Sequence, residues 1–290
     1  MEVRHIAVAG VETRYAEAGR PDAPAIVLIP PGLFGTGTLG GLFCPTLALW
    51  DTAIPALAAT NRVIALDTIG QGGTAAGDGA PGLDAALDHL AAFLDALAVP
   101  RAHLVGHDEG AMLAVRLAFR DPSRVASCTI VSSPTVAPSG DGLAPLFLAG
   151  PLEPRLSAQG QRWVLERLSY TPHHATAALL EDAVAAGAAP GGRLSDPSAM
   201  PRLTGSVMKA KGDNFARWRE EGFPVPAMVV WGTHDPTSGI AHARSTLELI
   251  AARQTATQMH LLNRAGYFAY REQPDLFNGL VAGFVRALEG

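Results

Sequence analysis

The chain has 290 residues, of which 48% are hydrophobic and 17% charged, and this composition excludes a disordered protein. Its formal net charge of −5 lacks the basic excess of nucleic-acid-binding proteins. Cys44 and Cys128 are far apart and have no metal-ligand spacing, so we expect neither a disulfide framework nor a metal site. The N-terminus lacks a signal-peptide pattern, and no segment is apolar over a bilayer-spanning length, which favours a soluble cytoplasmic protein.

Predicted strands and helices alternate along most of the chain. Residues 3–9 and 11–18 alternate in polarity and predict a hairpin with a tight turn at Gly10. Continuous apolar runs predict strands buried on both faces at residues 25–29, 62–67, 102–106, 125–132, 227–231 and 257–262. Apolar residues at helical spacing predict helices at 83–97, 111–119, 240–252 and 275–288. This order predicts an α/β fold with a mostly parallel, eight-stranded sheet flanked by helices, in which the hairpin is the antiparallel edge.

One stretch interrupts the alternation. Between residues 134 and 222 there is no strand-like run, and proline and glycine separate three helical segments at 161–170, 174–186 and 206–218. We therefore predict a helical cap at 134–222, inserted after the sixth strand. The core would then consist of residues 1–133 and 223–290.

The strongest local pattern is Gly-His-Asp-Glu-Gly at 106–110, between a predicted strand and a predicted helix. Gly-x-nucleophile-x-Gly at such a junction is a nucleophile elbow, in which small residues permit a strained turn that lifts the central side chain above the sheet. The N-terminus of the following helix favours negative charge there, and the central residue here is Asp108. The pattern alone also fits a plain strand–helix turn with Asp108 as the N-cap.

The order of elements and motifs resembles the α/β-hydrolase superfamily over nearly the whole chain. The elbow is similar to that of epoxide hydrolases and haloalkane dehalogenases, in which the aspartate attacks an alkyl carbon and forms an ester. The resemblance places the catalytic acid at Asp235, within Trp-Gly-Thr-His-Asp-Pro at 231–236. It places the oxyanion-binding amides on Leu33 and Glu109.

Several positions depart from these families. The superfamily's histidine usually stands in Gly-His-x-x-x-x-Glu-x-Pro after the last strand, whereas 266–274 reads Gly-Tyr-Phe-Ala-Tyr-Arg-Glu-Gln-Pro, so Tyr267 occupies the histidine position. Neutral tyrosine is a poor base for activating water. Glu109 replaces the tryptophan or arginine that follows the nucleophile in dehalogenases of this type. The insertion offers only Tyr170 where epoxide hydrolases use two tyrosines, and Pro31 stands where the oxyanion segment usually has histidine.

A displaced histidine is the remaining source of a conventional base. The candidates are His173, His174, His234 and His260. Each is more simply interpreted as a structural or exposed residue, because two lie in the insertion, one precedes Asp235 and one lies in a predicted strand.

Three schemes remain open. In the first, which we favour, Asp108 is a general base and Tyr267 a general acid in an elimination, isomerisation or cyclisation, and Asp235 orients Tyr267 by accepting its hydrogen bond. In the second, Asp108 is the nucleophile of an epoxide-hydrolase-like or other hydrolase, with Tyr170 or Tyr267 as acid and a displaced base. In the third, the protein is a pseudo-hydrolase that binds a ligand without turnover.

A substrate pocket is expected above the carboxyl ends of the strands, beneath the cap. The residues expected to contact a substrate are Gly32, Phe34, His107, Phe147, Trp163, Tyr170 and Trp218. Together they favour a small-to-medium apolar substrate, such as a polycyclic or polyketide-like natural product, although cap-to-core packing explains any single aromatic residue as well. Because dinucleotide-binding, phosphate-binding and zinc motifs are absent from the sequence, we expect no cofactor. We expect neither nucleic acid nor a membrane as partner, and a homodimer is compatible with the sequence.

Overall fold

The computed structural model describes residues 2–33, 43–77, 82–138, 152–189 and 200–290. At its centre is one eight-stranded sheet with the order β1-β2-β4-β3-β5-β6-β7-β8. The strands are β1 (Val3–Val8), β2 (Val11–Ala18), β3 (Ala25–Ile29), β4 (Arg62–Leu66), β5 (Ala102–His107), β6 (Val125–Val131), β7 (Ala227–Gly232) and β8 (Thr257–Leu262). β2 pairs antiparallel with β1 and β4, and the other neighbouring pairs are parallel. The predicted sheet and its antiparallel edge are confirmed.

The central strands are continuous apolar runs because helices cover both of their faces. Every residue of β3, β5, β6 and β7 is buried, whereas the edge strands β1 and β8 are largely exposed or partly buried. β1 and β2 are joined at Ala9 and Gly10, whose φ angles of 48° and 82° are both left-handed. Two positive φ angles are typical of the tight hairpin turn whose twist matches that of the flanking strands.

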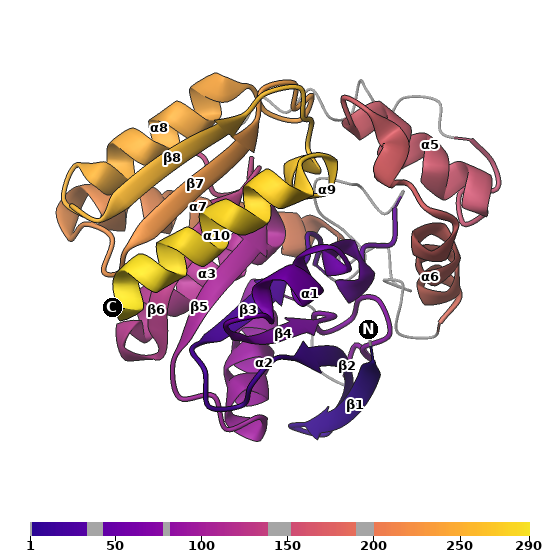
Figure 1. Cartoon of the computed structure of the whole chain (residues 1–290), viewed down its shortest axis with the longest axis horizontal. Coiled ribbons are helices and arrows are strands. Elements are labelled where there is room, and N and C mark those ends of the chain that lie inside the picture. Colours follow the sequence, from indigo (N-terminus) through magenta and orange to yellow (C-terminus); the bar gives the residue numbers. More distant parts are fainter. Residues whose placement is uncertain (1, 34–42, 78–81, 139–151, 190–199) are drawn as a thin grey trace.

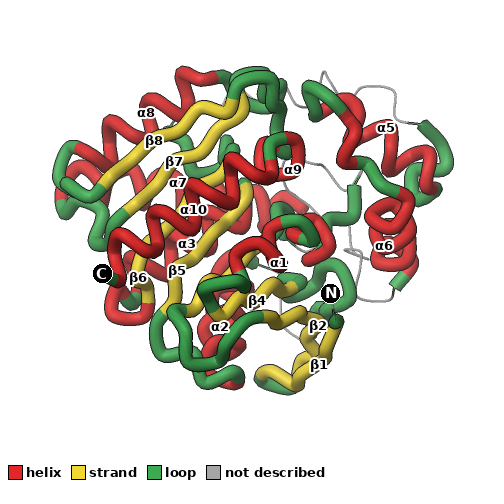
Figure 2. The backbone as a smooth tube through the Cα atoms, viewed as in Figure 1, coloured by secondary structure: helices red, strands yellow, loops and turns green. Residues whose placement is uncertain are grey.

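Helices form a layer on each face of the sheet (Figures 1 and 2). Ile26 and Leu28 of β3 pack in one apolar cluster with residues of α1 and α10, and Val27 and Ile29 pack in another with residues of α2, α3 and α7. The helices are α1 (Ala53–Leu57), α2 (Leu83–Ala96), α3 (Glu109–Arg120), α7 (Met200–Glu220), α8 (Ile240–Ala251), α9 (Ala269–Glu272) and α10 (Pro274–Glu289). The 3-10 turns η1 (Leu47–Trp50) and η2 (Pro122–Arg124) complete the core.

The insertion after β6 contributes α5 (Ala158–Leu168), the 3-10 turn η3 (Pro172–His174) and α6 (Ala177–Ala188) before α7. α5 and α6 pack on each other at one side of the molecule (Figure 1). α7 is different, because its buried Leu203, Ala210 and Trp218 belong to the cluster formed with α2 and α3. Helices therefore occur at all three predicted places in the insertion, and the limits of a separate cap at 134 and 222 stay a prediction.

None of the described helices is both long and apolar enough to cross a bilayer. Over the same described ranges, His, Cys, Asp and Glu side chains form no group of three that could hold a metal ion. Cys44 and Cys128 are both buried and are not joined to each other by a disulfide.

Candidate active site

Asp108 lies at the junction of β5 and α3 in a backbone conformation that L-residues rarely adopt, with φ 49° and ψ −108°. The flanking glycines are needed because the backbone approaches so closely. A Cβ on Gly106 would lie 2.4 Å from the backbone nitrogen of Ala111, and one on Gly110 would lie 2.4 Å from the Ile29 carbonyl oxygen. Such a conformation costs about 1–3 kcal/mol and persists only where the surrounding structure imposes it. The strained elbow that the glycine spacing predicts is therefore present.

Two hydroxyl groups hold the fully buried Asp108 carboxylate. The Tyr267 hydroxyl donates to Oδ2 at 2.7 Å, and the Thr135 hydroxyl donates to Oδ1 at 3.0 Å. The Ser133 hydroxyl also donates to the Asp108 backbone carbonyl at 2.8 Å. The loops that follow β6 and β8 thus meet at the elbow, and a carboxylate and a phenol stand in direct contact there.

Tyr267 is fully buried and remains protonated. Burial raises its pKa well above the usual range, and the negative charges of Asp108 and Glu109 raise it further. The backbone N–H of Tyr267 donates to the Leu168 carbonyl at 2.9 Å, at the end of α5. The phenol is therefore a hydrogen-bond donor at neutral pH, and the insertion fixes its backbone.

Asp235 does not accept the hydrogen bond of Tyr267, so the predicted contact is wrong. Its Oδ1 accepts from the backbone N–H and the hydroxyl of Thr237, at 2.8 and 2.7 Å, and its Oδ2 has no hydrogen-bond partner among the described residues. The physical reason is reach, because a phenol carries its hydroxyl further from the backbone than an imidazole carries its nitrogens. The Tyr267 hydroxyl therefore bonds directly to Asp108.

Burial raises the pKa of Asp235 from 3.8 to about 7, opposed by the Thr237 hydrogen bonds and reinforced by the charge of Asp108. A carboxyl with a raised pKa binds its proton more tightly in the folded state. It therefore lowers the free energy of unfolding as pH rises between about 4 and 7, and the loss persists above 7. Asp235→Asn is expected to remove this pH dependence. The free energy of unfolding of the variant, relative to that of the native chain, should therefore rise by on the order of 2–4 kcal/mol between pH 4.5 and pH 8.

Urea unfolding at those two pH values measures this difference. The matched control is Asp88→Asn, because Asp88 is exposed and pairs with Arg120 at the surface. Equal pH dependence in Asp235→Asn and the native chain would show that the Asp235 carboxyl is already ionised at low pH.

A carboxylate also lies at the predicted oxyanion segment. Oε2 of Glu109, which is 1% exposed, accepts the backbone N–H of Gly32 at 2.7 Å. On the other side of this segment, the Gln71 side chain donates to the Pro31 carbonyl at 2.5 Å. Leu33 is buried next to Gly32. The predicted oxyanion amides therefore have a negative side chain beside them, which disfavours a second negative charge at that position.

His107 packs against the ring of Tyr267 inside the core. It is fully buried, its ring centroid lies 4.1 Å from that of Tyr267, and its Nδ1 is 3.3 Å from the Tyr270 hydroxyl. Burial lowers the pKa of His107 to about 3, so the imidazole is neutral. The His107 ring therefore packs against Tyr267, and its contact with a substrate stays a prediction.

Two of the predicted substrate-binding residues pack against other aromatic rings. Trp218, 1% exposed, packs against Phe119 and Phe223 in the core, because α7 turns this side of its helix towards α3. Tyr170 is 40% exposed, and its ring packs against His234 at a tilted angle, with 4.4 Å between the centroids. The expectation for Trp218 is corrected, because its ring is enclosed in the core, whereas the substrate contact of Tyr170 stays a prediction.

The remaining predicted contacts are placed as follows. Trp163 of α5 is partly buried against the cluster around α1 and α10, and the Arg167 guanidinium lies 4.5 Å from its ring centroid. Phe34 and Phe147 fall outside the described residues. Among the candidates for a displaced base, His234 is exposed, and burial lowers the pKa of His174 to about 3.

Three site residues are absent from the sequence-based prediction: Ser133, Thr135 and Lys211. Ser133 and Thr135 follow β6, which neighbours β5, so the rule that parallel strands end at one edge could have identified them. Lys211 of α7 donates from Nζ to the Pro134 carbonyl at 2.8 Å. Its signal in the sequence is slight, because it is one of only two lysines and lies in the insertion.

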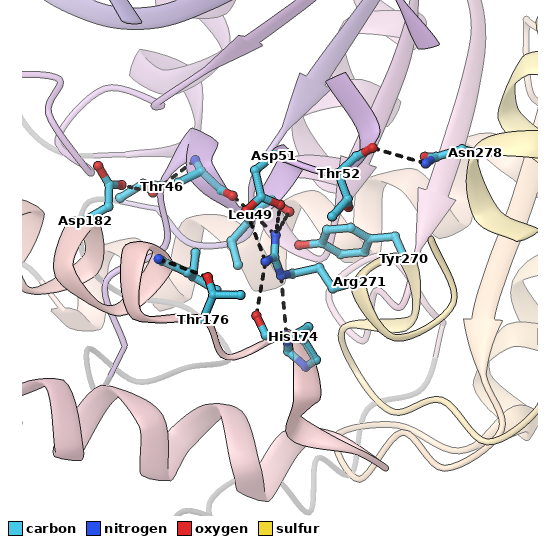
Figure 3. Close-up of polar contacts among 12 residues, drawn as sticks. Thr46, Leu49, Asp51, Thr52, His174, Thr176, Asp182, Tyr270, Arg271 and Asn278 are labelled. Carbon is cyan, nitrogen blue, oxygen red and sulfur yellow. Dashed lines mark hydrogen bonds and ion pairs between the residues drawn. The ribbon is translucent and has the colours of Figure 1, made fainter. Parts of the chain in front are cut away.

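The turn that carries Tyr267 is anchored by buried charged residues. Oε1 of Glu272 accepts the Gly266 N–H at 2.7 Å, and Oε2 accepts the Thr171 N–H at 2.8 Å. The buried Arg271 guanidinium donates to the Leu49 carbonyl at 2.6 Å, to Asp51 at 2.7 Å and to the His174 carbonyl at 3.2 Å (Figure 3). These contacts join the turn after β8, the η1 segment and the insertion.

A second set of contacts fixes α6 to the core. Asp182 accepts from the Arg14 guanidinium of β2 and from the Thr46 hydroxyl, each at 2.5 Å (the Thr46 contact is drawn in Figure 3). Arg14 also pairs with the buried Asp67 at 3.1 Å. Burial raises the pKa of Asp67 to about 6, although the Arg14 charge opposes the rise. Asp182 therefore joins the insertion to β2 and to Thr46.

Comparisons with known proteins agree with this fold. Residues 25–257 match the family described as alpha/beta hydrolase fold. The chain is 30% identical over 245 residues to a dihydrolipoyllysine-residue acetyltransferase component of an acetoin cleaving system from Pseudomonas putida, which covers 82% of this chain. The chain spans 60% of the length of that relative. It is 26% identical to a 2-hydroxy-6-oxo-2,4-heptadienoate hydrolase from P. putida F1, covering 98% of this chain and 96% of the relative.

Among solved structures, a variant of the meta-cleavage product hydrolase from Pseudomonas fluorescens IP01 superposes with a TM-score of 0.72 at 24% identity, covering 98% of this chain and 97% of that one. At this identity the likeness shows the fold alone. The narrower similarity of the elbow to epoxide hydrolases and haloalkane dehalogenases stays a prediction. The family match, the eight-stranded sheet and the strained elbow together identify the chain as an enzyme of the α/β-hydrolase superfamily.

Proposed function

We propose that this enzyme catalyses a non-hydrolytic proton transfer on an apolar substrate, in an elimination, isomerisation or cyclisation. Asp108 acts as general base and Tyr267 as general acid. The observation that carries the proposal is the 2.7 Å hydrogen bond from the Tyr267 hydroxyl to Asp108 Oδ2. A base and an acid in direct contact can exchange a proton within one step.

The raised pKa of Tyr267 defines how the pair works. A buried phenolate beside Asp108 and Glu109 is strongly disfavoured, so Tyr267 cannot give up its proton without receiving another. In the proposed step, a substrate C–H bond breaks, its proton moves to Asp108, and its electron pair forms the new bond or π system. Tyr267 delivers its proton to the departing or receiving atom and takes the proton of Asp108 through their hydrogen bond. The pair thereby returns to its starting state without water.

The surroundings of Asp108 also favour this scheme over ester hydrolysis. Hydrolysis of an aspartyl ester needs a base that activates water and donors that stabilise an oxyanion. The sequence resemblance aligns Tyr267 with that base, and Oε2 of Glu109 accepts the N–H of Gly32 beside the predicted oxyanion site.

Hydrolysis is the second candidate, and two observations favour it. The curated relatives include 2-hydroxymuconate semialdehyde hydrolase and 2-hydroxy-6-oxo-2,4-heptadienoate hydrolase. In addition, Asp235 is buried, its Oδ2 is unpartnered among the described residues, and burial raises its pKa to about 7. In this scheme Asp108 is the nucleophile and Asp235 replaces histidine as the base that activates water.

Turnover in doubly labelled water, D₂¹⁸O, separates the two candidates. A panel of aryl-substituted epoxides, esters, β-hydroxy ketones and α,β-unsaturated ketones would be incubated with the enzyme, and both product and protein would be weighed. For an isomerisation we expect deuterium at carbon in the product, and for an elimination we expect loss of the α-hydrogen without deuterium at carbon. In each case solvent ¹⁸O in the product should not exceed the amount that the same compound takes up without enzyme. Solvent ¹⁸O in the product, and in the peptide containing Asp108, would establish the hydrolytic scheme. Tight binding without turnover, unchanged in Asp108→Asn and Tyr267→Phe, would identify a pseudo-hydrolase.

A further inference from the structure

Lys211 brings a positive charge from α7 to the edge of the site. Its Nζ donates to the Pro134 carbonyl at 2.8 Å, and the next residue, Thr135, donates to Asp108 Oδ1. Burial lowers the pKa of Lys211, and the negative charge of Asp108 acts in the opposite direction. Because these two hydrogen bonds involve neighbouring residues of one loop, the ammonium group lies close to the Asp108 carboxylate.

This ammonium is half-buried, yet no carboxylate of the described residues lies within ion-pair distance of it. An ammonium has three donors, and only the bond to Pro134 uses one of them among the described residues. Lys209, two residues earlier, is in the opposite situation: it is exposed and pairs with Asp213 at 2.7 Å. A partly desolvated cation without a carboxylate partner is well suited to an anionic group that arrives with a ligand.

The charges around the elbow indicate which anion that would be. Glu109 places a carboxylate on the Gly32 amide, so the usual oxyanion position presents negative charge. Arg116 of α3 donates to Asn214 of α7 at 3.2 Å, and Lys209 pairs with Asp213. Among the described residues, Lys211 is a half-buried cation close to the Asp108 loop that pairs with no carboxylate, so it can meet a negative charge that develops next to Asp108.

We propose that Lys211 binds the carbonyl oxygen of the substrate and stabilises it as an enolate, and that the substrate is therefore a carbonyl compound with an acidic C–H next to the carbonyl. The proposal rests on the proposed function and narrows its substrate class. Asp108 removes the proton from the α-carbon, and the electron pair of that C–H bond moves to form a carbon–carbon double bond. The carbonyl π electrons move to the oxygen, where Lys211 donates a hydrogen bond. Collapse of the enolate then expels a β-substituent or accepts a proton at another carbon, with Tyr267 as the donor.

The position of Lys211 can be tested without a substrate, because the chain has only two lysines. Protein labelled with ¹³C at the lysine ε-carbon gives two signals, which Lys209→Arg and Lys211→Arg assign. We expect the Lys211 signal to titrate below the ordinary lysine pKa and to move lower still in Asp108→Asn, because the stabilising charge is removed. An unchanged Lys211 pKa in Asp108→Asn would overturn the proposal.

The ligand class is tested with 4-nitrophenolate, an aromatic enolate mimic whose ionised form is coloured. We expect it to bind the native protein, displace the Lys211 signal, and lose about tenfold or more in affinity in Lys211→Met. Lys209→Met is the control and should bind within about twofold of the native protein. Equal binding by Lys211→Met, or no displacement of the Lys211 signal, would overturn the proposal.

These readouts are independent of the reaction type. If the labelled-water experiment gives ¹⁸O in the product while Lys211 still binds nitrophenolate, the proposed function fails and the anion site stands. If turnover is non-hydrolytic but Lys211→Met retains full turnover and binding, the anion site fails and the Asp108–Tyr267 assignment stands.

Discussion

Replacement of Tyr267 by phenylalanine is expected to lower turnover by about 10²–10⁴-fold while the enzyme stays folded. The substitution keeps the buried ring against His107 and deletes only the hydroxyl that donates to Asp108 at 2.7 Å. Without that hydroxyl, the proton taken by Asp108 has no route to the departing or receiving atom. Steady-state kinetics on the substrate found in the labelled-water screen measure the effect, which should fall on kcat more than on KM.

Tyr270→Phe is the matched control for this prediction. Tyr270 is also fully buried, and its hydroxyl contacts His107 Nδ1 at 3.3 Å instead of Asp108. We expect its kcat to stay within about threefold of the native value, because a weak hydrogen bond behind the site is lost and no proton route is cut. Full activity in Tyr267→Phe, or equal losses in the two variants, would contradict the role of Tyr267 as acid.

Arg271→Met is expected to destabilise the fold by on the order of 3 kcal/mol. The guanidinium is 1% exposed and bonds to Asp51, to the carbonyl of Leu49 and to the carbonyl of His174 (Figure 3). Methionine retains much of the apolar stem but leaves these acceptors without their donor. A buried acceptor that has lost its donor costs more free energy than a hydrogen bond from which both partners have been removed. Urea unfolding, followed by tryptophan fluorescence, measures the change in the free energy of unfolding.

The control is Arg244→Met, which removes an exposed arginine that pairs with Glu248 one helical turn away at 3.0 Å. An exposed pair of this kind contributes below about 0.5 kcal/mol. If both variants lost the same small amount, Arg271 would not anchor the turn after β8.

The fold could be predicted from sequence because its signals are local. Continuous apolar runs such as those at 25–29 and 125–131 are typical of strands covered on both faces. The two elbow glycines indicate a close backbone approach, because any larger residue there would clash. The short elements α1 and α9 were not predicted, since five and four residues are too few to show a helical period.

The candidate site was predictable in its residues but not in its contacts. Asp108 and Tyr267 could be named from motif spacing, whereas the partner of the Tyr267 hydroxyl depends on the reach of the phenol across the sheet edge. The position of Trp218 was predicted wrongly, because the sequence of an amphipathic helix does not indicate which other elements pack against its apolar face. The contacts of Lys211 and Arg271 could not be predicted, because their partners, Pro134 and Asp51, are distant in sequence.

The contacts around Gly266 also limit how this enzyme can be recombined with its relatives. A Cβ on Gly266 would lie 2.4 Å from the Leu168 carbonyl oxygen, which accepts the Tyr267 N–H, and Glu272 accepts the Thr171 N–H. The backbone of Tyr267 is thus held by residues of the insertion. We expect a chimera that exchanges the whole insertion to displace Tyr267, so the junction has to leave residues 168–171 with the host.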